Sequence, residues 1–168
     1  GNAGTAREDG LANLAVTGTA ELIAFVRSEG IAFTLVGPEA PLAEGVVDAF
    51  QAAGLSIFGP KQAAARLESS KEFAKDFMAR HGIPTAAYAA FDAAAPAHAY
   101  VDERGAPIVI KADGLAAGKG VFVAGTEGEA HAAIELLLSE QKLGAAGARI
   151  VIEEHLEGEE AKIGRAHV

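Results

Sequence analysis

Apolar residues in the first third of the chain follow two alternating patterns, one with the period of a helix and one typical of buried strands. The apolar residues of 19–29 lie on one helical face, and Gly30 follows as a stop signal. Three further segments continue the alternation: a strand at 32–36, a helix at 41–53 and a strand at 55–58. Because the connections are short, this order predicts part of an open α/β domain with a parallel sheet.

The rest of the chain predicts a mixed α+β lobe. We expect Ser69 to open a helix with Glu72 as its capping-box partner, because the two side chains can each satisfy an exposed N–H group of the first turn. Thr126 and Glu129 repeat this arrangement at the start of a later helix. A glycine-rich segment between two strands favours an antiparallel pair. The other expected elements are a helix at about 96–104 and strands at 86–91, 107–111, 121–124 and 149–153.

Composition excludes several classes of function. Half of the 168 residues are hydrophobic and 22% are charged, which is typical of a globular protein with a core. The formal net charge of −9 argues against a nucleic-acid partner, since phosphate backbones require a basic surface. The absence of cysteine excludes disulfides and thiolate chemistry, and it is compatible with the cytoplasm, where we expect the protein. No apolar run approaches the roughly 20 residues that span a bilayer, so we expect no membrane partner.

The segment 107–121 is the strongest candidate for chemistry. A short apolar strand ends at Lys111, a loop with three glycines follows, and another strand begins at once. Glycines let the backbone approach a ligand closely, and lysines add positive charge. The segment is not a Walker A loop, because the loop leads into a strand and no Ser or Thr follows its second lysine. It predicts a flap over a polyphosphate, with candidate residues Lys111, Gly114, Gly118, Lys119 and Gly120.

A second strand repeats the design of the Lys111 strand. Residues 150–154 read Ile-Val-Ile-Glu-Glu, and more acidic residues follow as far as Glu160. Such a run can be only a solvated acidic edge. It can instead supply one carboxylate for an adenine amino group and another for ribose hydroxyls. The five histidines have no spacing typical of metal ligands, and we interpret them as structural or solvent-facing.

Together these stretches are similar to the phosphoribosylamine–glycine ligases (glycinamide ribonucleotide synthetases), a family of the ATP-grasp superfamily. The similarity rests on 108–121 and 150–161, and three more stretches agree in the order of the family, at 1–5, 36–42 and 67–85. The resemblance implies a partial N-terminal α/β (pre-ATP-grasp) domain over 1–60. It implies a partial ATP-grasp domain with the glycine-rich flap over 61–161.

The resemblance also implies a reaction. Members of this family use ATP to join glycine to 5-phosphoribosylamine in purine biosynthesis, through a glycyl phosphate intermediate. We therefore expect three small-molecule partners, namely glycine, 5-phosphoribosylamine and ATP. We also expect Mg²⁺, with its ligands in the C-terminal part of the family that lies outside this chain. Phosphate charge must be neutralised during transfer, and the acyl phosphate must be shielded from water, which a closing flap can do.

Individual roles follow from the same resemblance. Lys71 and Lys111 are expected to contact ATP phosphates under the loop 114–120. Adenine and ribose are expected to be held by the carboxylate of Glu153, the backbone near Leu156 and the carboxylate of Glu160.

The loop Gly37, Pro38 and Glu39 is expected to hold phosphoribosylamine, because α/β sheets bind ligands at the carboxyl ends of their strands. Alternatively, Glu39 has only a structural role, as an acidic residue whose charge interacts favourably with the dipole at the start of the following helix.

The family pattern is incomplete at both ends, and we interpret the chain as a fragment. The glycine-rich turn expected before residue 1 and the second half of the grasp are outside this sequence. After Ala161 the resemblance stops, and residues 162–168 match the translation of a common sequencing adapter, so we expect a non-native tail. We accordingly expect no ligase activity from the fragment alone.

Two alternatives are open at this point. Another ATP-grasp ligase would share Lys71, Lys111 and Glu153, although residues 112–118 and 37–41 favour the glycine ligase. The alternative from a different class is a non-catalytic nucleotide-binding module that has lost its catalytic half.

Overall fold

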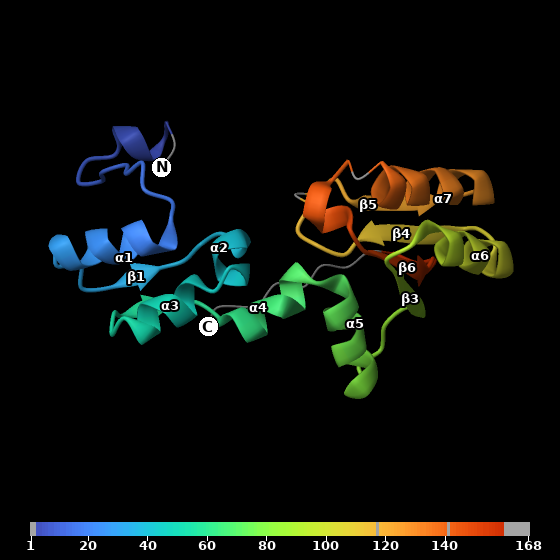
Figure 1. Cartoon of the computed structure of the whole chain (residues 1–168), viewed down its shortest axis with the longest axis horizontal. Coiled ribbons are helices and arrows are strands. Elements are labelled where there is room, and N and C mark those ends of the chain that lie inside the picture. Colours follow the sequence, from blue (N-terminus) through green and yellow to red (C-terminus); the bar gives the residue numbers. More distant parts are fainter. Residues whose placement is uncertain (1–2, 117, 141, 160–168) are drawn as a thin grey trace. The chain divides into compact units, whose positions relative to one another are not determined.

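The computed structural model describes residues 3–116, 118–140 and 142–159, and it divides into two compact units. One unit comprises Gly1–Arg66 and the other Leu67–Val168, coloured along the sequence in Figure 1. Each has its own hydrophobic core. Within the described ranges, no helix is long and apolar enough to cross a membrane.

The first unit joins two short parallel strands through helices. Thr34 pairs with Ile57 and Leu35 with Phe58, which confirms the predicted parallel sheet. Its described elements are η1 (Thr5–Arg7), α1 (Thr19–Ser28), β1 (Thr34–Leu35), α2 (Glu39–Ala43), α3 (Val46–Ala52) and β2 (Ile57–Phe58), and α4 (Gln62–Ser69) runs across the boundary.

The helix expected at 41–53 is two helices in the structure. Gly45 has a φ of 86°, a left-handed conformation that only glycine adopts readily, so α2 ends before it and α3 begins after it. Val47 and Phe50 of α3 are buried against Val26 of α1. The helix predicted at 19–29 is confirmed as α1.

The second unit is built around a four-stranded antiparallel sheet. The strand order is β3-β6-β4-β5, so β6 inserts between two strands that precede it in the sequence. The pairing of β4 with β5 confirms the antiparallel pair expected around the glycine-rich segment. Its elements are α5 (Lys71–Arg80), β3 (Tyr88–Phe91), α6 (Ala94–Arg104), β4 (Ile108–Ala112), β5 (Val121–Ala124), α7 (Glu127–Ile134), η2 (Glu135–Ser139), η3 (Gly144–Gly147) and β6 (Ile150–Glu154).

One face of this sheet is covered by α6 and α7, which lie beside its strands in Figure 1. Successive side chains of a strand point to opposite faces. In β4, Ile108 and Ile110 are therefore buried under the helices, while Val109 and Lys111 lie on the other face. The helix-covered core consists of Ala97, Val101, Ile108, Ile110, Ala112, Ala124, Ala130, Ala133, Ile134, Leu137, Ile150 and Ile152.

The two predicted capping boxes have different outcomes. At α7, Thr126 Oγ1 accepts from the backbone N–H of Glu129, whose side chain accepts in return, so this box is confirmed. At α5 the prediction is wrong, because Ser69 ends α4 and Ser70 caps α5 instead. Glu72 pairs with Arg149, a residue far along the chain that no local pattern could indicate.

Candidate functional site

The sheet face opposite α6 and α7 carries the charged residues of the predicted site. Val109 of β4 lies directly opposite Glu153 of β6, which places Lys111 on the same face one step further along β4. Lys111 Nζ donates to Glu153 Oε2 at 2.9 Å. The Glu153 side chain is 7% exposed and that of Lys111 is 26% exposed. The structure therefore brings these two sequence-predicted residues into direct contact.

A second lysine, which the sequence analysis missed, holds the same carboxylate. Lys75 of α5 is buried, and its Nζ lies 2.9 Å from Glu153 Oε2. The same ammonium donates to Thr85 Oγ1 at 2.7 Å and to the carbonyl of Ala86 at 3.4 Å. A helical lysine normally extends its ammonium group to the solvent, so the sequence gave no signal for this burial.

The first turn of α5 is anchored to the residue at which the flap begins. Asp113 Oδ1 accepts from the backbone N–H of Glu72 at 2.8 Å and from the Ser70 hydroxyl at 3.2 Å. The Asp113 carbonyl accepts from the backbone N–H of Lys71 at 3.2 Å. A carboxylate at a helix N-terminus satisfies its exposed donors and complements the helix dipole. Asp113 therefore fixes α5 to the end of β4.

Lys71, a predicted phosphate ligand, lies at this junction. Its Nζ donates to the carbonyl of Gly114 at 3.2 Å. Burial lowers the pKa of Lys71 below its ordinary value of 10.5, the nearby Asp113 opposes that shift, and the positive charge of Lys111 adds to it. An incoming anion would favour the charged form of this ammonium, because it would neutralise the local positive charge.

The glycines of the loop between β4 and β5 lie in two different environments. A Cβ on Gly120 would lie 2.7 Å from Ala116 Cβ and 2.9 Å from Ala112 Cβ, so packing within the protein excludes a side chain there. Gly118 and Lys119, by contrast, are exposed near the tip of the loop, where the amide of Lys119 donates to the carbonyl of Ala116. The loop thus has a packed base and a solvent-facing tip.

The remaining predicted residues have separate positions. Leu156 follows β6 and is 64% exposed. Gly37, Pro38 and Glu39 belong to the first unit, where all three are exposed between β1 and the first turn of α2. Glu160 and the predicted tail at 162–168 lie outside the described residues.

The helix-covered side has a polar cluster of its own between α6 and α7. The Nδ1 atoms of His98 and His131 are 2.7 Å apart, so one of them donates to the other. His98 Nε2 contacts Glu135 at 2.7 Å, and His131 Nε2 contacts Asp102 at 3.1 Å. This chain of contacts ties the two helices together. Among the described residues, no group of three or more histidine or carboxylate side chains is arranged to hold a metal ion.

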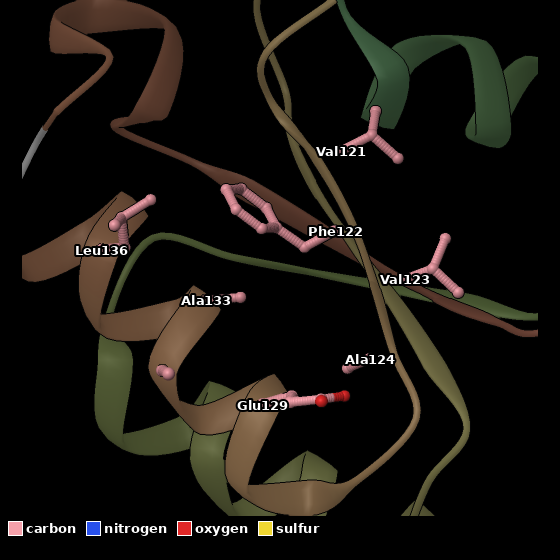
Figure 2. Close-up of a pocket in the computed structure, with 8 residues that line it drawn as sticks. Val121, Phe122, Val123, Ala124, Glu129, Ala133 and Leu136 are labelled. Carbon is pink, nitrogen blue, oxygen red and sulfur yellow. The ribbon is translucent and has the colours of Figure 1, made fainter.

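A cavity of about 510 Å³ lies beside the edge strand β5. Figure 2 shows Phe122 extending toward Ala133 and Leu136, with Val121 and Val123 on the other side of the strand. Its lining is mostly apolar, and among the described residues no predicted ATP-binding side chain contributes to it. The charged face, rather than this cavity, is the candidate site.

Two family models match the chain and together account for almost all of it. The phosphoribosylglycinamide synthetase N domain matches residues 1–68. The phosphoribosylglycinamide synthetase ATP-grasp (A) domain matches residues 69–165. The chain belongs to the phosphoribosylglycinamide synthetase family.

Curated relatives and solved structures agree with this membership. The phosphoribosylamine–glycine ligase of Ralstonia nicotianae is 65% identical over 161 residues, which are 96% of this chain and 38% of that protein. The ligase of Pasteurella multocida is 61% identical over 163 residues, again 38% of its length. This chain therefore spans about 38% of these two relatives.

The crystal structure of the phosphoribosylamine–glycine ligase of Thermotoga maritima matches with a TM-score of 0.68 at 31% identity, covering 94% of this chain and 37% of that one. A biotin carboxylase of Campylobacter jejuni matches with a TM-score of 0.69 at 23% identity, covering 83% of this chain and 32% of that one. At that level of identity, the second match shows a shared fold only.

Proposed function

We propose that this chain is part of a phosphoribosylamine–glycine ligase that forms glycinamide ribonucleotide, ADP and phosphate from glycine, 5-phosphoribosylamine and ATP. The observation that carries the proposal is the charged sheet face, where Lys71, Lys111 and Glu153 gather beside a glycine-rich loop. The 65% identity to a curated ligase over 161 residues supports the same reaction for the protein of which this chain is a part. The chain would supply much of the ATP site.

The chemistry of the face suits the phosphate end of ATP. The ammonium groups of Lys71 and Lys111 would neutralise phosphate oxygens, and the loop 114–120 would close over them and exclude water from the acyl phosphate. This role explains why a lysine with a lowered pKa is kept at the first turn of α5. Phosphate binding would favour its charged form.

The acidic side of the face suits the nucleoside end. A carboxylate paired with lysines acts as a hydrogen-bond acceptor, so Glu153 would select an exocyclic amino group of the adenine kind. The backbone near Leu156 and the carboxylate of Glu160 would hold the rest of the nucleoside. Gly37, Pro38 and Glu39 of the first unit would bind phosphoribosylamine.

Magnesium does not enter the roles proposed for these residues. ATP-grasp ligases in general use ATP with Mg²⁺, but the described part of this chain contains no cluster of three or more metal-ligating side chains. The ammonium groups of Lys71 and Lys111 would act on phosphate oxygens directly.

A chimera tests the proposal with a complete enzyme. Residues 1–161 of this chain replace the matching 38% of the Ralstonia nicotianae ligase. We expect ADP release that depends on both glycine and 5-phosphoribosylamine, measured with a coupled assay. The 168-residue chain alone is expected to release no ADP above background. A folded chimera that binds ATP but shows no such activity would contradict the proposed reaction.

Lys111→Met in the same chimera tests the site. Loss of one charge-assisted hydrogen bond to phosphate is expected to weaken ATP binding by about 10- to 100-fold, which calorimetry measures. Lys142→Met is the matched control, because Lys142 is an exposed lysine paired with Glu140. Unchanged ATP affinity in Lys111→Met would remove Lys111 from the site.

A further inference from the structure

Lys75 is buried in a way that leaves it no capacity for a ligand. Only 7% of the residue is exposed. An ammonium has three donors, and here three acceptors meet it, namely Thr85 Oγ1, Ala86 O and Glu153 Oε2. A buried charge is stable only when it is paired and hydrogen-bonded. The surroundings of Lys75 meet both conditions within the protein, so its role must act through one of these partners.

The partner that matters is Glu153, because two lysines share one of its oxygen atoms. The Nζ atoms of Lys75 and Lys111 each lie 2.9 Å from Glu153 Oε2. The two lysines differ in exposure, since the side chain of Lys75 is 9% exposed and that of Lys111 is 26% exposed. Lys111 is therefore the cation that can leave Glu153 for an anionic ligand.

We propose that Lys75 is the resident counter-ion of Glu153 and, through it, a positioning residue for Lys111. This inference rests on the proposed ATP site. When Lys111 turns to a phosphate oxygen, Glu153 keeps one cation and does not become an unpaired buried carboxylate. Without Lys75, the same movement would leave Glu153 buried without a cation, so Lys111 would stay paired with it. Lys75 thus makes Lys111 available to phosphate.

A double-mutant cycle in ATP affinity tests this coupling. Calorimetry of the 168-residue chain compares the wild type, Lys75→Met, Lys111→Met and the double variant. In the wild-type background, Lys111→Met is expected to weaken ATP binding by about 10- to 100-fold. In the Lys75→Met background, the same change is expected to weaken it by less than about 3-fold, because Lys111 is already committed to Glu153. Equal losses in both backgrounds would overturn the proposal, since a merely structural lysine would leave the effect of Lys111→Met unchanged.

A second cycle needs no nucleotide and separates the inference from the proposed function. Urea unfolding gives the coupling of Glu153→Gln with Lys75→Met and, separately, with Lys111→Met. The coupling to Lys75 is expected to be the larger, because that pair is the more buried. If Glu153→Gln couples to Lys111→Met as strongly as to Lys75→Met, or more strongly, Lys75 is not the resident counter-ion of Glu153. If the chimera that carries wild-type residues 1–161 binds no ATP, the proposed nucleotide site fails, while this urea cycle still decides the role of Lys75.

Two further variants serve as a substitute for Lys75→Met and as a control. If Lys75→Met does not fold, Thr85→Val removes one of the acceptors of Lys75 and should reduce the effect of Lys111→Met in the same direction. Lys142→Met is the control, because its 2.7 Å pair with Glu140 is exposed and should leave both cycles unchanged.

Discussion

The two faces of the four-stranded sheet are made from the same strands and held by different forces. Under α6 and α7, Ile110 and Ile152 are fully buried in an apolar core. On the opposite face, the same strands carry Lys111 and Glu153. Burial of apolar surface has no preferred direction, whereas each polar contact requires defined partners and angles. The helix-covered face should therefore tolerate substitutions that keep its volume, while the charged face should lose stability when a single partner is removed.

The largest effect is expected when the polar face loses its only buried carboxylate among the described residues. Glu153→Gln removes the counter-ion of Lys75, which stays buried. Breaking a buried pair from one side typically lowers the free energy of unfolding by about 3–5 kcal/mol, and urea denaturation measures it. Glu157→Gln, an exposed residue just beyond β6, should change it by less than about 0.5 kcal/mol. If Glu153→Gln lowers the free energy of unfolding by less than Ile110→Ala does, the expected difference between the two faces is contradicted.

The apolar face should lose stability in proportion to the volume removed. Ile110→Ala is expected to cost about 3 kcal/mol and Ile110→Val about 1 kcal/mol, since the neighbours relax only partly around a cavity. Val123→Ala on the edge strand is the control, because Val123 is 63% exposed and should cost under about 1 kcal/mol. Similar losses for Ile110→Ala and Val123→Ala would show that the helices do not seal this face.

A smaller effect is expected at the junction that anchors α5 beside the polar face. Asp113→Ala removes the acceptor of Glu72 N–H and of the Ser70 hydroxyl, and it should cost about 1 kcal/mol. Amide hydrogen exchange in the first turn of α5 should become faster. Thr126→Ala removes the cap of α7 at a similar cost, but it should leave exchange in α5 unchanged. Faster exchange in α5 for both variants would indicate global destabilisation instead.

The smallest expected effect is the uptake of a proton by Lys71 when ATP binds. Burial lowers its pKa from 10.5, so its charge opposes folding at neutral pH, and this penalty is relieved as pH rises through the lowered pKa. Phosphate binding favours the charged form and raises that pKa again. ATP binding should therefore take up protons at alkaline pH, and ATP affinity should fall as pH rises there.

Calorimetry in buffers of different ionisation enthalpy measures this proton uptake. Lys71→Arg should abolish it, because a guanidinium stays charged throughout that pH range. Uptake that persists in Lys71→Arg would assign the proton to another group.

Local patterns predicted the parts of this protein that depend on neighbouring residues. The glycine-rich segment between β4 and β5, the capping box of α7 and the helix at α1 are all confirmed, since each depends on residues a few positions apart. Lys111 and Glu153 were chosen from residue types at the ends of apolar strands, and the structure brings them to 2.9 Å. The family was likewise evident from the order of short motifs, and the family models show it.

Only the tertiary structure decided which residues complete the charged face. Asp113 contacts Glu72 across 41 positions of sequence, and Lys75 of α5 meets Glu153 of β6, the strand that lies between β3 and β4. The sequence assigned the cap of α5 to Ser69 because periodicity cannot show that α4 already ends there. Hydrophobic periodicity and capping patterns describe each element and its termini, whereas the pairing of buried charges depends on strand order. In this sheet the order places β6, the bearer of Glu153, between β3 and β4.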